Sequence, residues 1–141
     1  MTDWDPKTFE DNLIADMRAN GGKVTSGPMA GKPLLVMNST GAVSGEPRRA
    51  IVNFTRDGDD YVIAGSAAGR PTDPAWIHNI EANPDVTVEA DGRTFDATAS
   101  IAGESEHDRL WDQHVAALPQ FAAYPEQSGR VIPMVRLTPK G

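Results

Sequence analysis

Residues 33–64 read PLLVMNSTGAVSGEPRRAIVNFTRDGDDYVIA, which is three apolar runs separated by turn-forming residues. The runs Pro33–Asn38, Arg49–Thr55 and Tyr61–Ala64 are predicted strands, because large apolar and β-branched residues dominate them. Asp57-Gly58, between the second and third runs, is a strong signal for a tight hairpin turn. This stretch therefore predicts strands joined by short turns, with a loop of small residues after the first strand.

Two loops of small residues follow apolar runs in this region. The first, Ser39–Arg49, ends in the adjacent arginines Arg48 and Arg49. The second, Ala64–Asn79, leads into a helix that Pro74 opens. Such loops expose backbone N–H groups to an anion, and the arginines add positive charge. Together the two loops suggest a pocket for a phosphorylated cofactor.

Each loop also has an ordinary structural interpretation. The first would serve as a hairpin connection with its arginines in solvent. The second would serve as a helix entry, with Thr72 or Asp73 as N-cap and Pro74 at the first helical position. A capped helix N-terminus remains electropositive, so both interpretations of the second loop are compatible.

Helices and a second hairpin are predicted in the rest of the chain. The first helix starts at Pro6, carries one apolar stripe and ends at Gly21-Gly22. Asp91-Gly92 predicts another tight turn. The remaining expected elements are a short helix from Pro74 to about Asn83, strands at Val86–Ala90, Thr94–Ile101 and Val131–Leu137, a helix at Ser105–Leu118, and an irregular segment at Pro119–Gly129. These elements make a small closed or split β-barrel with helices outside.

Composition bounds the class of protein. The 141 residues fit a single domain, with an N-terminal helical segment over 1–22 and the barrel with its cofactor site over 23–141. A net charge of −7 argues against binding to nucleic acid, which demands clustered positive charge. We expect no metal site, because the chain has no cysteine and His107 and His114 lie seven residues apart.

The location of the protein is also predicted from composition. No apolar run approaches the length that a membrane span needs, and the N-terminus has no signal-peptide core. We therefore expect a cytoplasmic protein.

An aromatic-bearing segment precedes the last predicted strand. Phe121 and Tyr124 lie in it, shortly before Arg130. Such a segment either closes over a pocket as a lid or covers the end of the barrel. The residues alone leave these two alternatives open.

Several ordered motifs resemble one known family. They are Thr40-Gly41-x-x-Ser44-Gly45, Asp57-Gly58-Asp59 before Tyr61–Ala64, Ser66-x-x-Gly69, Asp73-Pro74-Ala75-Trp76-x-x-Asn79, Ala82-Asn83-Pro84-x-Val86, and Tyr124 followed by Arg130-x-Ile132-Pro133. From about Gly21 to Pro139 the chain resembles the deazaflavin-dependent nitroreductase family of actinobacteria, whose members bind coenzyme F420. The resemblance implies an α+β or mainly β fold, a split β-barrel of about six or seven strands with flanking helices.

The resemblance also implies roles for individual residues. The phosphate and acidic tail of the coenzyme would be held by Ser44, Gly45, Arg48 and Arg49. The deazaflavin ring would be lined by Ala64, Ser66, Ala67, Ala68, Pro74, Trp76 and Asn79. Tyr124 falls on the lid tyrosine of the family, near the reacting face, so Tyr124 and Ser66 are the expected catalytic hydroxyls.

The implied reaction is hydride transfer from reduced F420 to an electron-poor small molecule, such as a quinone, an enone or a nitroaromatic. Barrels of this type often pair, so a homodimer is expected. Two alternatives stay open. One is FMN as the cofactor. The other is a non-catalytic module that binds a cofactor or a lipophilic ligand, because Ala42-Val43 and Ala67 stand where the family usually has basic residues.

Overall fold

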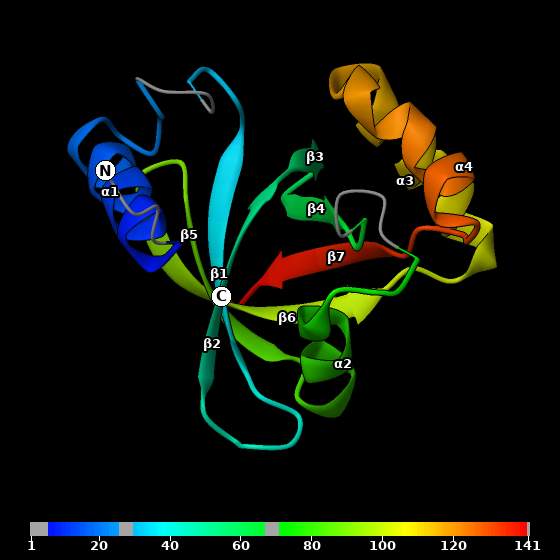
Figure 1. Ribbon diagram of the computed structural model, residues 1–141, viewed down its shortest axis with the longest axis horizontal. Helices are drawn as coiled ribbons and strands as arrows, with labels where there is room; N and C mark the ends of the chain where they lie inside the picture. Colours follow the sequence, from blue (N-terminus) through cyan, green and yellow to red (C-terminus); the bar gives the residue numbers. More distant parts are fainter. Residues whose placement is uncertain (1–5, 26–29, 67–70, 141) are drawn as a thin grey trace, which may run out of the picture.

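The computed structural model of the chain describes residues 6–25, 30–66 and 71–140. The elements in chain order are α1 (Pro6–Ala19), β1 (Leu34–Thr40), β2 (Pro47–Asn53), β3 (Thr55–Asp57), β4 (Asp60–Ala64), α2 (Ala75–Ala82), β5 (Asp85–Ala90), β6 (Arg93–Ile101), α3 (Glu104–Ala117), the 3-10 helix η2 (Pro119–Ala123), α4 (Tyr124–Ser128) and β7 (Met134–Pro139). Figure 1 shows a curled sheet with helices around it.

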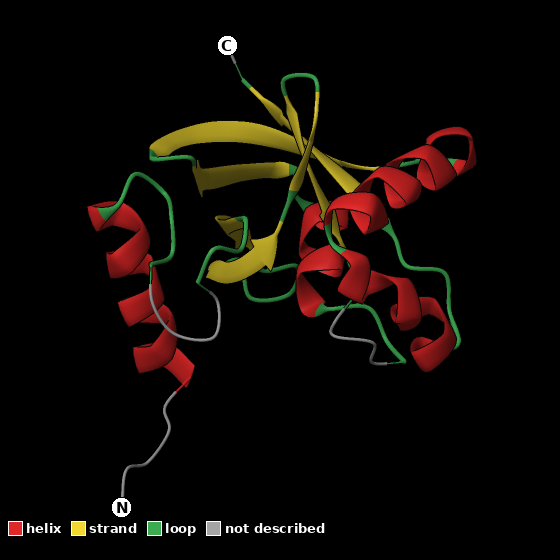
Figure 2. Ribbon diagram, turned by 90° about the horizontal axis from the view of Figure 1, so that it is seen from above, coloured by secondary structure: helices red, strands yellow, loops and turns green. Residues whose placement is uncertain are grey.

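The seven strands form one sheet in the order β2-β1-β5-β6-β7-β4-β3. Every neighbouring pair in this order is antiparallel. Helix α1 lies on one side of the sheet, and the other helices gather on the opposite side (Figure 2). This half-barrel confirms the predicted α+β split barrel of six or seven strands with flanking helices.

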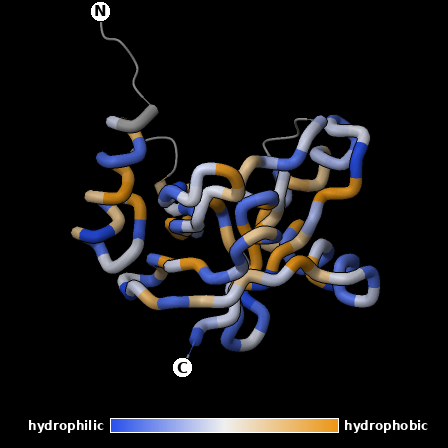
Figure 3. Tube along the Cα trace, turned by 90° about the horizontal axis from the view of Figure 1, so that it is seen from below, coloured by the Kyte–Doolittle hydropathy of each residue, from blue (hydrophilic) through white to orange (hydrophobic). Residues whose placement is uncertain are grey.

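Both faces of β1 and β4 are covered, which explains why the sequences of these two strands contain continuous apolar runs. In β4, Tyr61 and Ile63 belong to the main core inside the curl, whereas Val62 belongs to a second cluster under α3 and η2. In β1, Leu35 faces the main core and Val36 faces α1. The apolar segments accordingly concentrate in the strands at the centre of the molecule (Figure 3).

The two predicted hairpin turns are confirmed. Asp57 pairs with Asp60 across Gly58, and Ala90 pairs with Arg93 across Asp91-Gly92. Gly58 has a φ of 62°, and Asp91 and Gly92 have φ values of 53° and 77°. These left-handed conformations are the ones that tight hairpin turns require and that Gly and Asp tolerate best.

The prediction of one strand over Arg49–Thr55 is wrong. The chain bends at the buried Phe54, so that β2 pairs with β1 while β3 pairs with β4. Because β2 and β3 are the two ends of the strand order, this bend carries the chain from one edge of the sheet to the other. The backbone N–H of Phe54 donates to the carbonyl of Pro33, 3.1 Å away.

The segment Pro119–Gly129 is not irregular as predicted. It forms η2 and α4, and Gly129 ends α4 in a left-handed conformation with a φ of 68°. Pro119 and Pro125 each stand in the first turn of a short helix, where proline is tolerated. The last strand begins at Met134 rather than at Val131.

We predict that Gly22→Ala destabilises the protein by about 3 kcal/mol, through left-handed strain and overpacking together. A Cβ on Gly22, whose φ is 94°, would lie 2.5 Å from the backbone nitrogen of Gly92. Gly21→Ala is the matched control, since Gly21 has a φ of 66° but open space around it. Gly21→Ala is expected to lower the free energy of unfolding by about 1 kcal/mol. Urea unfolding of the two variants measures the difference, and equal losses would contradict the close approach.

Candidate functional site

A pocket of about 730 Å³ opens between the β2 edge of the sheet and the end of β4. Its other walls come from the start of α2 and from η2 and α4. Its volume lies in the range of sites for small molecules and cofactors. The residues that line it are Glu10, Leu34, Ala50, Ile51, Val52, Asn53, Ala64, Ser66, Thr72, Asp73, Pro74, Ala75, Trp76, Phe121 and Tyr124.

Five of the residues expected at the site lie together on the wall of this pocket. They are Ala64, Ser66, Pro74, Trp76 and Tyr124. Ala67 and Ala68 lie outside the described residues. The remaining expected residues do not line the pocket, and their places in the fold differ from one another.

The first loop joins β1 to β2 as a tight hairpin connection. Gly45 takes a φ of 71°, and its N–H donates to the carbonyl of Gly41 at 3.0 Å. Arg48 donates from Nη2 to the Ser44 hydroxyl at 3.1 Å and lies 3.6 Å from a carboxylate oxygen of Glu46. The loop therefore presents one guanidinium beside a hydroxyl and a glycine turn.

The adjacent arginines point to opposite faces of β2, because side chains alternate along a strand. Arg49 contacts α1, with 3.0 Å to a carboxylate oxygen of Asp11 and 3.1 Å to one of Glu10. The hydrogen bond with Asp11 is the main reason why the pKa of Arg49 is raised. Arg48 shares its face with Ala50, which lines the pocket and packs against the main core.

Asn79 ties the first loop to α2. Its buried side chain accepts, at Oδ1, a hydrogen bond from the N–H of Ala42 at 2.9 Å. Asn79 lies one helical turn after Trp76, which is half-buried and packs against the main core while it lines the pocket. The same short helix thus contributes a pocket wall and an anchor for the loop.

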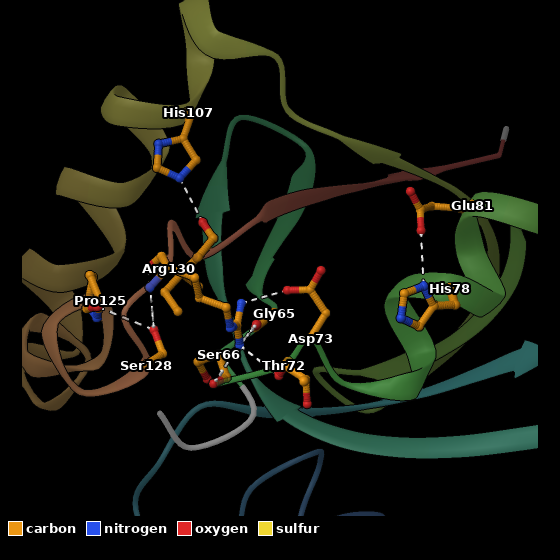
Figure 4. Close-up of polar contacts among 11 residues, drawn as sticks. Gly65, Ser66, Thr72, Asp73, His78, Glu81, His107, Pro125, Ser128 and Arg130 are labelled. Atoms are coloured by element: carbon orange, nitrogen blue, oxygen red, sulfur yellow. Dashed lines mark hydrogen bonds and ion pairs between the residues drawn. The ribbon is translucent and has the colours of Figure 1, made fainter. Parts of the chain in front are cut away.

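Asp73 does not cap α2. The N-cap position is Pro74, without a side-chain cap bond, so neither Thr72 nor Asp73 has the predicted capping role. Asp73 instead forms an ion pair of 2.6 Å with Arg130, as Figure 4 shows. A partner 57 residues further along the chain had no local sequence signal.

A row of aromatic rings runs from the core to the pocket. The ring of Tyr124 lies edge-on to Phe121 at 5.1 Å between centroids, and Phe121 lies edge-on to His114 at 4.7 Å. His114 is fully buried, and its Nδ1 lies 2.9 Å from the hydroxyl of Thr55. Its Nε2 has no hydrogen-bond partner among the described residues.

Sequence reasoning did not identify His114 as a core residue. The signal was present, because His114 lies four residues after Leu110 and four before Leu118, on the face predicted to point inward. Burial lowers the pKa of His114 to about 4, so the imidazole is neutral at neutral pH.

Two other features were sought in the part of the chain that the structure describes. No group of three or more histidine, aspartate or glutamate side chains is placed there to hold a metal ion. The helices of residues 6–25, 30–66 and 71–140 include none with the length and apolarity of a membrane span.

Comparison with known proteins gives one consistent family. The sequence model of the F420H(2)-dependent quinone reductase family matches residues 12–139. The F420H(2)-dependent quinone reductase Rv1261c of Mycobacterium tuberculosis is 33% identical over 124 residues, which are 86% of this chain and 83% of that protein. The resemblance to F420-dependent proteins is therefore confirmed.

Solved structures agree with the sequence comparison. The F420-H2 dependent reductase FDR-A superposes with a TM-score of 0.68 and 30% sequence identity, over 74% of this chain and 93% of that one. A further structure, described as a domain-swapped dimer, gives a TM-score of 0.71 and 25% identity, over 94% of this chain and 99% of that one.

We predict that His114 makes the protein less stable in acid. The unfolded histidine binds a proton below its ordinary pKa of 6.5, whereas the folded one does so only near pH 4. The free energy of unfolding therefore falls between these two values as pH falls, by about 3 kcal/mol in total. In His114→Asn this part of the pH dependence disappears.

Urea unfolding at several pH values between 7 and 4.5 measures this contribution as the difference between wild type and variant. His78→Gln is the control for replacing a histidine, because His78 is exposed. Parallel curves for wild type and His114→Asn would show that folding does not lower the pKa of His114.

Proposed function

Because the chain belongs to the F420H(2)-dependent quinone reductase family, we propose that the pocket beside the β2 edge holds coenzyme F420 and a quinone. The protein is accordingly an F420-dependent reductase. The observation that supports this location is that Ala64, Ser66, Pro74, Trp76 and Tyr124 line one pocket of about 730 Å³. When bound, reduced F420 supplies the hydride.

The pocket fits a flat ring system in both shape and chemistry. Trp76, Phe121 and Tyr124 give it aromatic walls, and the small side chains of Ala50 and Ala64 leave space between them. Binding sites for such ligands are mostly apolar, with a few polar groups that fix orientation. We propose that the aromatic walls pack against the ring and that the polar groups of the second loop orient it.

The acidic tail of the coenzyme is proposed to reach the first loop. Arg48 stands on the face of β2 that it shares with Ala50 and Val52, and both of these line the pocket. Arg48 lies two residues before the pocket-lining Ala50 and contacts Ser44 of the first loop. A guanidinium beside a hydroxyl binds phosphate or carboxylate through charge-assisted hydrogen bonds.

Arg48 and Arg49, which the sequence analysis both assigned to the coenzyme tail, therefore receive different roles in this proposal. We propose that Arg48 binds the coenzyme, while Arg49 is engaged by the carboxylates of α1. Asn79 is proposed to act by holding the backbone of the first loop in place. Val43, at the tip of that loop, is fully exposed, and its side chain adds no charge.

A hydroxyl is proposed to complete the reaction at the substrate oxygen. Hydride transfer to a quinone leaves negative charge on that oxygen, and a nearby O–H stabilises the charge and then donates its proton. Tyr124 is half-buried on the pocket wall with its ring held against Phe121, so its position is defined. Ser66, buried at the end of β4, is the second candidate donor.

Further parts of the proposal concern substrate range, assembly and organisation. Quinones are favoured by the family, and enones and nitroaromatics are proposed as additional electron-poor substrates. F420 is favoured over FMN, because the matching family is named for F420H(2).

A homodimer is supported by the related structure that is described as a domain-swapped dimer. We also propose that residues 1–141 act as a single domain in the cytoplasm.

The purified protein is expected to oxidise reduced F420 when a quinone is added, and not reduced FMN at a comparable rate.

Tyr124→Phe is expected to lower kcat by about 10²-fold while the Kd for F420 stays nearly constant, because only the proton donor is lost. Ser66→Ala tests the second candidate donor, and a comparable fall of kcat in that variant alone would assign the proton to Ser66 instead. A loss confined to affinity would remove Tyr124 from the proton-donor role, and a wild type without turnover would overturn the proposed function.

Arg48→Gln is expected to raise the Kd for F420 by about tenfold or more, since a charge-assisted contact with the acidic tail is lost. Arg49→Gln, one residue away, is expected to lower stability slightly and to leave the Kd nearly unchanged. Fluorescence titration of both variants at low and high salt measures the effect. Equal losses of affinity would instead assign both arginines to the coenzyme.

A further inference from the structure

The guanidinium of Arg130 joins the two described ends of the second loop. Its Nη2 donates to the carbonyl oxygens of Gly65, Ser66 and Thr72, at 3.0, 3.2 and 3.1 Å. Its Nη1 donates to Oδ1 of Asp73 at 2.6 Å. Figure 4 shows these four contacts converging on one side chain from the segment between α4 and β7.

The backbone that carries Arg130 is itself held on both sides. Before it, the left-handed Gly129 ends α4, and the buried Ser128 hydroxyl accepts a hydrogen bond from the N–H of Arg130 at 3.3 Å. After it, Nε2 of His107 donates to the carbonyl of Ile132 at 2.7 Å. Arg130 is therefore a fixed group against which the loop is placed.

Only an arginine fits this arrangement. The side chain of Arg130 is 16% exposed, and the planar guanidinium offers several donors in fixed directions. Three carbonyls and one carboxylate around it satisfy a largely buried positive charge. A lysine would keep the charge, but a single ammonium lacks the width to contact both ends of the loop in this way.

The contacts of Arg130 also set the direction of the peptide groups. In a trans peptide the C=O and the following N–H point to opposite sides. Because the carbonyls of Gly65 and Thr72 point toward Arg130, the N–H groups of Ser66 and Asp73 point away from it. Ser66, Thr72 and Asp73 line the pocket, whereas Arg130 does not.

We propose that Arg130 is a positioning residue for the coenzyme site. It draws the loop carbonyls to its own side and thereby leaves backbone N–H donors on the pocket side. Such donors recognise a ring edge that carries carbonyl oxygens, which deazaflavins and quinones share. The inference rests on the proposed function, and it assigns to Arg130 a role through the loop rather than through direct contact with the coenzyme.

The test uses Arg130→Gln and Arg130→Lys in the full-length protein. Arg109→Gln is the control, because Arg109 of α3 forms an ion pair with Asp57 of β3, and neither residue lines the pocket. Three kinds of measurement are made: the Kd for F420 by fluorescence titration, steady-state kinetics that give the KM for F420 and kcat with a quinone, and hydrogen exchange of the coenzyme-free protein. Hydrogen exchange reports on the loop independently of activity.

Both Arg130 variants are expected to raise the Kd and the KM for F420 by about tenfold or more, with a smaller change in kcat. Faster exchange should be confined to peptides that span residues 65–73, and lysine should not restore binding. Arg109→Gln should match the wild type in all three.

The proposal is overturned if Arg130→Lys binds F420 like the wild type, or if exchange increases throughout the barrel while the Kd is unchanged. If the wild type itself binds no F420, the proposed function fails. The exchange of residues 65–73 in the coenzyme-free variants then still decides whether Arg130 orders the loop.

Discussion

The bend at Phe54 is the constraint on which the architecture depends. One continuous run of chain pairs with β1 before this residue and with β4 after it, so the same segment serves both edges of the sheet. A flat sheet cannot satisfy both pairings, and the sheet therefore curls. The ring of Phe54 is buried in the main core, edge-on to Tyr61 at 5.2 Å between centroids, which keeps the bend in place. The pocket lies along the β2 side of this seam, where no further strand covers the edge.

The arginines of this acidic chain illustrate how a strand and a loop distribute charge. Alternation along β2 sends Arg49 to the carboxylates of α1 and leaves Arg48 beside the first loop. Arg130 is used differently, since its contacts are mainly backbone carbonyls rather than a ligand or the solvent. A guanidinium can thus shape a site from outside its wall, by fixing which backbone groups face the ligand.

Local signals in the sequence were sufficient for much of the fold. The Asp57-Gly58 and Asp91-Gly92 turns were predicted because their chemistry is contained in two residues, and the hairpins follow from them. The bend at Phe54 was not predicted, since residues 49–55 contain no glycine or proline that would mark a break in the strand. The motifs pointed to Ser66, Trp76 and Tyr124, and these three residues line one pocket. The ion pair of Asp73 with Arg130 has no such local signal, because it depends on tertiary contact between distant parts of the chain. The spacing of His114 from Leu110 and Leu118 indicated a place in the core. His114 was nevertheless missed, because the core was predicted from apolar residues alone and a buried, neutral histidine is unusual.

Helix α1 is attached to the sheet by two kinds of interaction with different physical properties. Ile14 and Met17 pack on Leu34 and Val36, while the flanks of the helix are fixed by ion pairs at the surface, such as Arg18 with Glu89. Exposed ion pairs weaken as ions accumulate around them, whereas the apolar contact does not. Glu10 of this helix and Leu34 beneath it both line the pocket. The attachment of α1 at this rim of the pocket therefore rests mainly on the apolar contact, and only its flanks depend on interactions that salt weakens.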